Sequence, residues 1–439
     1  MAAAETTQAI ERQTIAKVSW RLLPLVALGY CIAYIDRSNI SVASLTMNKD
    51  LAFSAYIYGW GAGIFFFGYF LFEIPSNLIL EKVGARIWIA RIMITWGIIS
   101  GLTAFVTGTT SFLIIRFLLG AAEAGFFPGM ILYLTYWFPN QYRGRVISTL
   151  FIAQPVANAV ASIASAAILE MDGIWGIKGW QWIFIIEAIP AVVLGLFILR
   201  IMTDKPLHAE WLSAEERNWL QGRLDSESRQ VESKGRMTLM RALADPRVAA
   251  LSAIYLMSVT ANYGIVFFMP QIIKGIGLTN MMTGVVSSIP YIIGTVGLLA
   301  WGWSSDRNNE RRWHLITAST LGALGLAFAA WSGSSYWALL GMSGATVGIY
   351  GSRAAFWPMP SIFLTGTAAA GAIAMINAIG NLGGYFGPFV VGWIRDSTKS
   401  FEAGLYFLAA CSLMAAVITL FAARAAGASA AVPRPSPAE

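Results

Sequence analysis

Residues Thr110–Phe138 read TSFLIIRFLLGAAEAGFFPGMILYLTYWF. The stretch is long and apolar enough to cross a bilayer as one helix, which takes about 20 residues, yet it carries Arg116 and Glu123. A charge near the middle of a membrane helix costs on the order of 2.5–3.5 kcal/mol, so such a side chain faces other helices or a watery cavity. The two charges are about two turns, or about 10 Å, apart on one face, too far to neutralise each other. We therefore expect a helix bundle with a charged interior, which either serves function or only holds helices together through ion pairs.

The composition indicates the class of protein. The chain has 439 residues, 57% hydrophobic and 12% charged, and its mean hydropathy is +0.62. A soluble domain of this length needs far less apolar surface, so we expect an all-α polytopic membrane protein. The net charge of +7 comes largely from short connections between apolar segments, which indicates orientation in a membrane and no nucleic-acid partner. Cys31 and Cys411 both lie in apolar segments, so we expect no disulfide framework and no cysteine-based metal site.

Twelve apolar segments are long enough to span a bilayer. They cover residues 20–46, 56–80, 86–107, 110–138, 143–169, 180–202, 248–272, 283–303, 312–331, 335–364, 367–394 and 402–424. Six spans, one long polar connection and six more spans predict two six-helix bundles.

The same pattern divides the chain into five parts. The bundles cover residues 20–202 and 248–424, and residues 1–19 precede them. Residues 203–247 form a cytoplasmic linker, in which the spacing of Ser213 and Glu216 matches a capping box and predicts the start of a surface helix. Residues 425–439 are small and Pro-rich, so we expect a disordered tail.

The basic residues predict the orientation. Most of them lie on the side of the N-terminus, including the cluster between Arg200 and Arg247. The connections on the other side hold only Lys49, Lys178, Lys274, Arg395 and Lys399. Because basic loops stay in the cytoplasm, both termini should be cytoplasmic. Residues 1–19 lack an apolar core with a cleavage site, so the first span should itself be the insertion signal.

Two connections carry an acid–base pair at the same turn of corresponding helices. Glu81-Lys82 follows the second span, and Asp306-Arg307 follows the eighth. Both resemble the loop motif G-x-x-x-D-R-x-G-R-[RK] of the major facilitator superfamily, although the first copy has Asn77 in place of the glycine. In that superfamily the motif latches the two halves together on the cytoplasmic side. The resemblance therefore implies a conformational role for these four residues.

The first span contains adjacent charges, Asp36 and Arg37. Adjacent helical residues point about 100° apart, so one of them can face a cavity while the other contacts a neighbouring helix. Together with Arg116 and Glu123 they make a set that is neutral when all four are ionised. A proton on either acid would make the set cationic and able to hold an anion, which is the physical logic of proton-coupled anion uptake. Alternatively, two closed salt bridges only fix the helices in place.

Uncharged polar residues also lie at membrane depth. Tyr69 and Gln154 could donate to a substrate or to a backbone carbonyl. Asn377 and Asn381 are four residues apart, hence on one helix face, beside glycines that allow a bend. Gating and substrate contact are both open for these asparagines. We expect roles in helix association for three further embedded charges: Glu73, Arg91 and Glu187.

Several stretches carry family motifs, namely Tyr34–Ile40, Phe66–Asn77, Arg116–Gly129, Phe356–Pro360 and Gly380–Gly384. Together they resemble the anion:cation symporter family of the major facilitator superfamily, over about residues 15–425. The resemblance is closest to the bacterial branch that holds tartrate, galactonate, hydroxyphenylacetate and phthalate transporters. It implies proton-driven import of organic acid anions across the bacterial inner membrane, with access to a central site alternating between its two sides.

The resemblance also implies roles for individual residues. Asp36 and Glu123 match proton-carrying acids. Arg37 and Arg116 match cations that hold those acids or the substrate carboxylate. The matching substrate contacts are Tyr69, Gln154 and one of two asparagines, Asn377 or Asn381.

Arg353 is a separate observation from the residues of span 10. It lies near mid-depth, and no embedded acid of the second half is an obvious partner. An unpaired arginine there is costly, so something anionic or watery should meet it. A substrate with two carboxylates, such as tartrate or phthalate, could bridge Arg353 and the arginines of the first half. Alternatively, Arg353 reaches water or bonds backbone carbonyls at a helix break near Gly351.

These observations predict a secondary active transporter that imports an organic acid anion by proton symport. The alternative is a facilitator or exchanger without net proton coupling. We find no nucleophile–base arrangement, phosphate-binding loop or metal-ligand spacing, so we expect no enzyme, no metal and no cofactor. The expected partners are the anion, protons and the lipid bilayer, and we expect a monomer.

Overall fold

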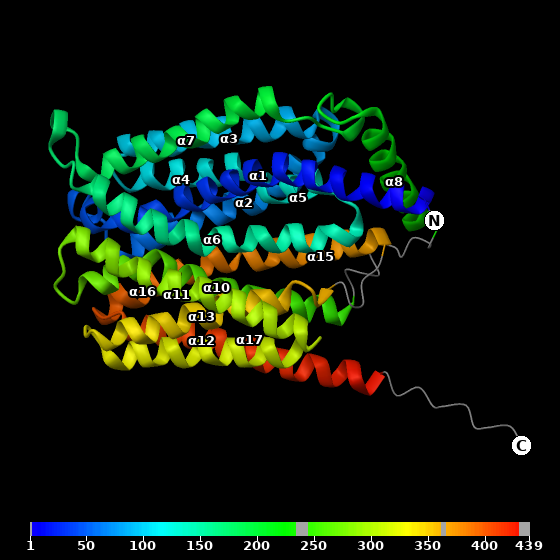
Figure 1. The fold of residues 1–439 in the computed structure, drawn as a ribbon. Helices are drawn as coiled ribbons and strands as arrows, with labels where there is room; N and C mark the ends of the chain where they lie inside the picture. The colour runs from blue at the N-terminus through cyan, green and yellow to red at the C-terminus, as the bar shows by residue number, and fades with distance from the viewer. Residues whose placement is uncertain (1, 234–244, 361–365, 430–439) are drawn as a thin grey trace, which may run out of the picture.

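The chain folds into two groups of helices that lie side by side (Figure 1). The computed structural model describes residues 2–233, 245–360 and 366–429, and this part of the chain contains no strand. The first half is made of α1 (Ala2–Asp50), α2 (Ala55–Val83), α3 (Ala85–Leu102), α4 (Thr109–Glu123), α5 (Phe126–Thr135), α6 (Asn140–Leu169) and α7 (Gly179–Ile201). The second half is made of α10 (Pro246–Lys274), α11 (Asn280–Arg307), α12 (Arg312–Ser332), α13 (Trp337–Phe356), α15 (Gly366–Asn381), α16 (Gly383–Thr398) and α17 (Glu402–Ser429).

The helices run nearly parallel to one axis, so the bundle has two ends. We call the end where α1 begins and α8 (Ala214–Ser233) lies the terminal end, and the other the far end (Figure 1). Because successive spans alternate in direction, α2 runs from the far end to the terminal end, and α6 and α10 run the opposite way. These directions give the depth of each residue in the bundle.

The prediction of twelve membrane spans in two six-helix bundles is confirmed. Within the described residues, ten helical segments are long and apolar enough to cross a membrane, and they correspond to the first nine predicted spans and the last. The tenth span is α13, and the eleventh is formed by α15 and α16. The helices that fall short of this criterion are α13, α15 and α16, whereas the largest boundary difference is at the first span, which was predicted to begin at residue 20 and is helical from Ala2.

The prediction of one continuous helix over residues 110–138 is wrong. The helix breaks after Glu123, where Gly125 adopts a left-handed conformation with φ of 84°. A Cβ at Gly125 would lie 2.3 Å from Oγ of Ser76 on α2, so the small residue also permits a close approach of that helix. The break places Glu123 at the last position of α4, and α5 continues in the same span.

Three other predicted boundaries also differ from the structure. Span 10 was expected to reach residue 364, but α13 ends at Phe356, and residues 361–364 lie outside the described part. Span 11 is interrupted at Leu382, at the glycine-rich stretch where a bend was allowed. The last helix continues to Ser429, into the tail that was expected to be disordered, and residues 430–439 lie outside the described part.

The linker helix α8 is bound to the first half. Its predicted capping box is present, because the Ser213 hydroxyl accepts a hydrogen bond from the backbone N–H of Glu216 at 3.2 Å and the Glu216 carboxylate accepts one from the N–H of Ser213 at 2.9 Å. Glu216 also pairs with Lys17 of α1 at 2.7 Å. Further along, Glu227 accepts a hydrogen bond from the N–H of Asn140, where α6 begins. The rest of the predicted linker, residues 234–244, lies outside the described part.

At the far end the two halves meet backbone to backbone. A Cβ at Gly59 of α2 would lie 2.2 Å from the carbonyl oxygen of Pro388 on α16. A Cβ at Gly284 of α11 would lie 2.3 Å from the carbonyl oxygen of Ser162 on α6. Since no real Cβ tolerates such distances, glycine is required at both positions for the halves to close here.

One carboxylate joins the halves at the same end. Asp396 on α16 accepts hydrogen bonds from the backbone N–H groups of Ala55 and Tyr56, at 3.1 and 2.9 Å. These donors belong to the first turn of α2, which has no intrahelical acceptors for them. The second half therefore caps a helix of the first half, and the far end is closed.

We predict that Gly59→Ala destabilises this closed arrangement. The added methyl group meets a backbone oxygen, and overpacking of this kind costs about 1–3 kcal/mol. The midpoint of thermal unfolding in detergent should fall. Gly144→Ala is the matched control, because it is also a helical glycine but a Cβ there meets no atom within 4 Å; alanine should stabilise that helix by up to about 1 kcal/mol. Equal midpoints for the two variants would contradict the close contact at Gly59.

Candidate functional site

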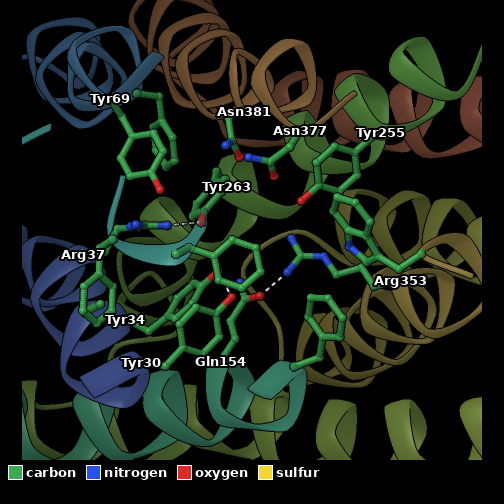
Figure 2. A pocket seen from close by; sticks show the side chains of 16 residues that line it. Tyr30, Tyr34, Arg37, Tyr69, Gln154, Tyr255, Tyr263, Arg353, Asn377 and Asn381 are labelled. Atoms are coloured by element: carbon green, nitrogen blue, oxygen red, sulfur yellow. Dashed lines mark hydrogen bonds between the residues drawn. The ribbon is translucent and has the colours of Figure 1, made fainter. Parts of the chain in front are cut away.

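A cavity lies between the two halves near the middle of the bundle. Its volume is about 30 Å³, room for no more than a few water molecules. The polar side chains around it come from both halves (Figure 2). They are Tyr30, Tyr34, Arg37, Tyr69 and Gln154 from the first half, and Tyr255, Tyr263, Arg353, Asn377 and Asn381 from the second.

Arg37 connects the first half, the second half and the cavity. Its guanidinium forms an ion pair with Glu123 at the end of α4 and donates a hydrogen bond of 3.0 Å to the hydroxyl of Tyr263 on α10. The guanidinium carbon also lies 5.0 Å from the ring centre of Tyr34 and 5.6 Å from that of Tyr69. A cation held by one carboxylate and by aromatic faces can exchange partners with little movement. Arg37 is therefore the cation of the first half that is placed to meet an anion in the cavity.

Asp36 points away from the cavity. Its carboxylate accepts hydrogen bonds from Nε1 of Trp96 at 2.8 Å and from the hydroxyl of Ser100 at 3.1 Å, both on α3. The side chain is 1% exposed. This is the division expected for adjacent helical residues: one member of the pair faces the cavity, and the other faces a neighbouring helix.

Arg116 does not line the cavity, although it was predicted to contact substrate. It is fully buried on α4, and its Nε donates to the carbonyl oxygen of Gly61 at 3.2 Å. The ring of Phe65 lies 5.2 Å from its guanidinium carbon and also 5.2 Å from that of Arg37. Phe65 thus lies beside both cations, and only Arg37 reaches the cavity. A substrate contact for Arg116 stays a prediction.

Arg353 lines the cavity from the second half. It donates to the side-chain oxygen of Gln154 on α6, and its Nε has no hydrogen-bond partner among the described residues. Arg353 and Arg37 extend into the cavity from opposite halves (Figure 2). In this structure the guanidinium of Arg353 meets a neutral amide of the first half, and the expected contact with an anion or with water stays a prediction.

The other predicted contact residues also surround the cavity. Tyr69, Asn377 and Asn381 all line it, so the geometry leaves open which asparagine would touch a substrate. Asn377 additionally donates a hydrogen bond of 2.8 Å to Oε1 of Glu73, a residue for which we expected a role in helix association only.

The analysis of the sequence missed most of the tyrosines in this site. Tyr30 and Tyr34 share a helix face with Arg37, and the hydroxyls of the two tyrosines lie 3.3 Å apart. Tyr263 and Tyr255 of α10 lie across the cavity from them. The spacing of Tyr30, Tyr34 and Arg37 was visible in the sequence, whereas no pattern indicates that α10 would supply the hydroxyl that Arg37 meets.

The residues of the predicted latch lie at the terminal end. Glu81 and Lys82 are exposed at the end of α2. Asp306 pairs with Arg311 at 2.5 Å, and Arg307 lies over the ring of Trp303, so these two contacts stay within the second half. A latch between the halves stays a prediction.

The described residues contain no group of three or more His, Cys, Asp or Glu side chains that could hold a metal ion. The polar groups of the cavity are cations, phenols and amides, which suit an organic anion and offer no ligand set for a cation such as Zn²⁺ or Mg²⁺.

Comparisons with known proteins agree with this architecture. A family model described as Major Facilitator Superfamily matches residues 26–371. A protein of Agrobacterium vitis with the provisional name tartrate transporter is 50% identical over 422 residues, covering 95% of this chain and 93% of its own. A quinolone resistance transporter of Acinetobacter baumannii is 40% identical, covering 93% of this chain and 94% of its own.

The fold is also found in solved structures. A bacterial homologue of the human lysosomal transporter Spinster superposes with a TM-score of 0.76 at 16% identity, over 94% of this chain and 98% of its own. The chain therefore belongs to the major facilitator superfamily, as a multi-pass membrane protein whose family and relatives are transporters rather than enzymes, and these relatives agree with the anion:cation symporter branch that its motifs resemble.

Proposed function

We propose that this protein is a secondary transporter that imports an organic acid anion together with a proton across the bacterial inner membrane. The observation that carries the proposal is the position of Arg37, which is paired with buried Glu123 and at the same time lines the cavity. The relatives named for tartrate transport and for metabolite transport support an organic acid as the substrate. The positive-inside pattern supports a cytoplasmic terminal end.

The ion pair offers a direct route from a proton to an anion. A proton on Glu123 removes the negative charge that holds Arg37. Because a buried guanidinium without an anion is costly, Arg37 then favours a carboxylate in the cavity. By linkage, the bound anion favours the proton on Glu123 to the same extent, with couplings of this kind typically about 1–3 kcal/mol.

Asp36 fits a more distant role in the same process. It lies on a different face of α1 from Arg37 and contacts α3, so a change of its charge would act on the position of α1 and not on the anion directly. We retain Asp36 as a second proton-carrying residue of the proposal.

Two arginines on opposite sides of the cavity favour a substrate with two carboxylates. Arg37 belongs to the first half and Arg353 to the second, so a dianion could hold both halves at once. Arg37 and Arg353 each bond across the cavity to the other half, to Tyr263 and Gln154, so a dianion that binds both arginines would replace these bonds and allow the halves to move. Movement of two halves around one site is the basis of alternating access.

Glu123→Gln tests the proton coupling. Glutamine cannot exchange a proton, so accumulation of labelled tartrate or phthalate in proteoliposomes under an inward proton gradient should be lost, while substrate counterflow without a gradient should persist. Glu170→Gln, at an exposed acid next to α6, is the control and should accumulate substrate normally. Normal accumulation and pH dependence in Glu123→Gln would assign Glu123 a structural role. If the rate of uptake by the wild type does not depend on the proton gradient, the protein is better explained as a facilitator or exchanger.

Lysine substitutions separate the roles of Arg37 and Arg116. Lysine does not reproduce the planar fork that binds a carboxylate through two hydrogen bonds, so Arg37→Lys should raise KM by about tenfold or more. Arg116→Lys should leave KM close to wild type and lower the unfolding temperature, since Arg116 bonds the backbone of α2. A similar rise of KM in both variants would show that substrate also reaches Arg116.

Arg353→Gln tests the preference for two carboxylates. In competition assays, wild type should prefer phthalate over benzoate and tartrate over its monoamide, because each dianion meets both arginines. The variant should lose this preference. Arg395→Gln is the control: it removes a cation at the far end, away from the cavity, and should keep the preference for dianions. If wild type and Arg353→Gln prefer the dianion equally, Arg353 does not bind the second carboxylate.

A further inference from the structure

Glu73 and Asn377 form a contact between the halves that the proposed coupling does not use. Nδ2 of Asn377 on α15 donates to Oε1 of Glu73 on α2 at 2.8 Å. Glu73 is 5% exposed and Asn377 is 8% exposed. The second carboxyl oxygen of Glu73, Oε2, is buried and has no hydrogen-bond partner among the described residues.

The contact lies at the edge of the cavity that faces the terminal end, where Asn377 also lines the cavity. Glu73 follows the cavity residue Tyr69 by one helical turn, and α2 runs toward the terminal end. Asn377 precedes the cavity residue Asn381 by one turn, and α15 runs away from the terminal end. Four helical residues rise about 6 Å, so the hydrogen bond lies about 6 Å nearer the terminal end than Tyr69 and Asn381.

This side of the cavity is closed more thinly than the other. At the far end the halves meet through glycines and backbone carbonyls. Toward the terminal end, the Glu73–Asn377 and Arg353–Gln154 hydrogen bonds join the halves at the cavity. Near them, the rings of Phe151 and Trp357, one from each half, stack at 6.2 Å. Contacts between side chains can separate through rotamer changes, whereas a glycine-lined backbone interface separates only when whole helices move.

The surroundings of Glu73 determine how it tolerates burial. The charged and titratable groups that face it are Tyr69 on its own helix, Arg37 on α1 and Tyr255 on α10. Arg37 is already paired with Glu123, and no ion pair of Glu73 is found among the described residues. An ionised carboxylate without a cation partner costs several kcal/mol to bury, whereas a neutral acid accepts the amide hydrogen bond at little cost.

We propose that Glu73 and Asn377 form a proton-operated gate between the cavity and the cytoplasm, an inference that rests on the proposed function for its direction. The gate is closed while Glu73 carries a proton. When the halves part at the terminal end, water reaches Glu73, the proton leaves to the cytoplasm, and the carboxylate keeps the gate open until it is protonated again. Glu73 is thus a proton-release residue that acts on access and does not bind the substrate.

The test measures access to the cavity and needs no substrate. A single cysteine at position 381 (Asn381→Cys, in a background with Cys31→Ser and Cys411→Ser) is labelled with a maleimide in detergent at pH 6 and pH 8. Rates are normalised to the denatured protein at each pH, which removes the effect of pH on the thiol. The reagent must come through the terminal end, because the far end is closed.

Labelling should be several-fold faster at pH 8 than at pH 6. Adding Glu73→Gln should abolish this difference and keep labelling slow, because glutamine accepts the bond from Asn377 and cannot ionise. Adding Asn377→Ala should make labelling fast at both values. Glu187→Gln, at a buried acid bonded to Ser165 within the first half, should behave as wild type.

Labelling that does not depend on pH in the parent, or that keeps its pH dependence with Glu73→Gln, would overturn the gate. Slow labelling with Asn377→Ala would also overturn the gate. This result can be read even if Glu73→Gln does not fold. Because no transport is measured, these outcomes are independent of the Glu123→Gln experiment. That experiment can contradict proton coupling while the labelling supports the gate, and the reverse result is equally possible.

Discussion

A guanidinium buried in a low-dielectric interior must always have an anion or an equivalent partner nearby, and this constraint on Arg37 organises the site. Glu123 supplies the anion, Tyr263 supplies a hydroxyl from the other half, and aromatic rings cover the remaining faces. Any event that removes one partner forces the arginine to find another. The helix break at Gly125 contributes by ending α4 at Glu123, and Asp36 leaves room by turning to Trp96.

The two ends of the bundle have different kinds of contact between the halves. The far end relies on shape, because glycines bring backbones together and Asp396 caps α2. The contact next to the cavity on the other side relies on a titratable group. A contact made by shape has a fixed cost of separation, whereas a contact made by an acid has a cost that varies with its charge. This difference suits a transporter whose central site opens to the two sides of the membrane at different times.

The sequence predicts the fold well, because apolar length and loop charge are local properties. The same is true of Asp36 and Arg37, whose different directions, about 100° apart, follow from helix geometry alone. The spacing of Arg116 and Glu123 was less informative: it placed both on one face but could not tell which neighbour each would meet, and only Glu123 reached Arg37. The role of Tyr263 and the bond between Glu73 and Asn377 depend on how the halves dock, which no pattern within one helix records. The helix end at Phe356 was missed because hydropathy continues across it, whereas the interruption at Leu382 falls in the glycine-rich stretch where a bend was allowed.

The attachment of α8 to the first half changes where one half stops and the other begins. Lys17 pairs with Glu216 at its start and Asn140 bonds to Glu227 further along, so both of these polar contacts go to helices of the first half, α1 and α6. The covalent connection between the halves therefore starts after Ser233 and not after Ile201. A chain divided between Ser233 and Pro246 would leave each fragment with its own contacts intact, whereas a cut before α8 would strip the first fragment of a helix that belongs to it.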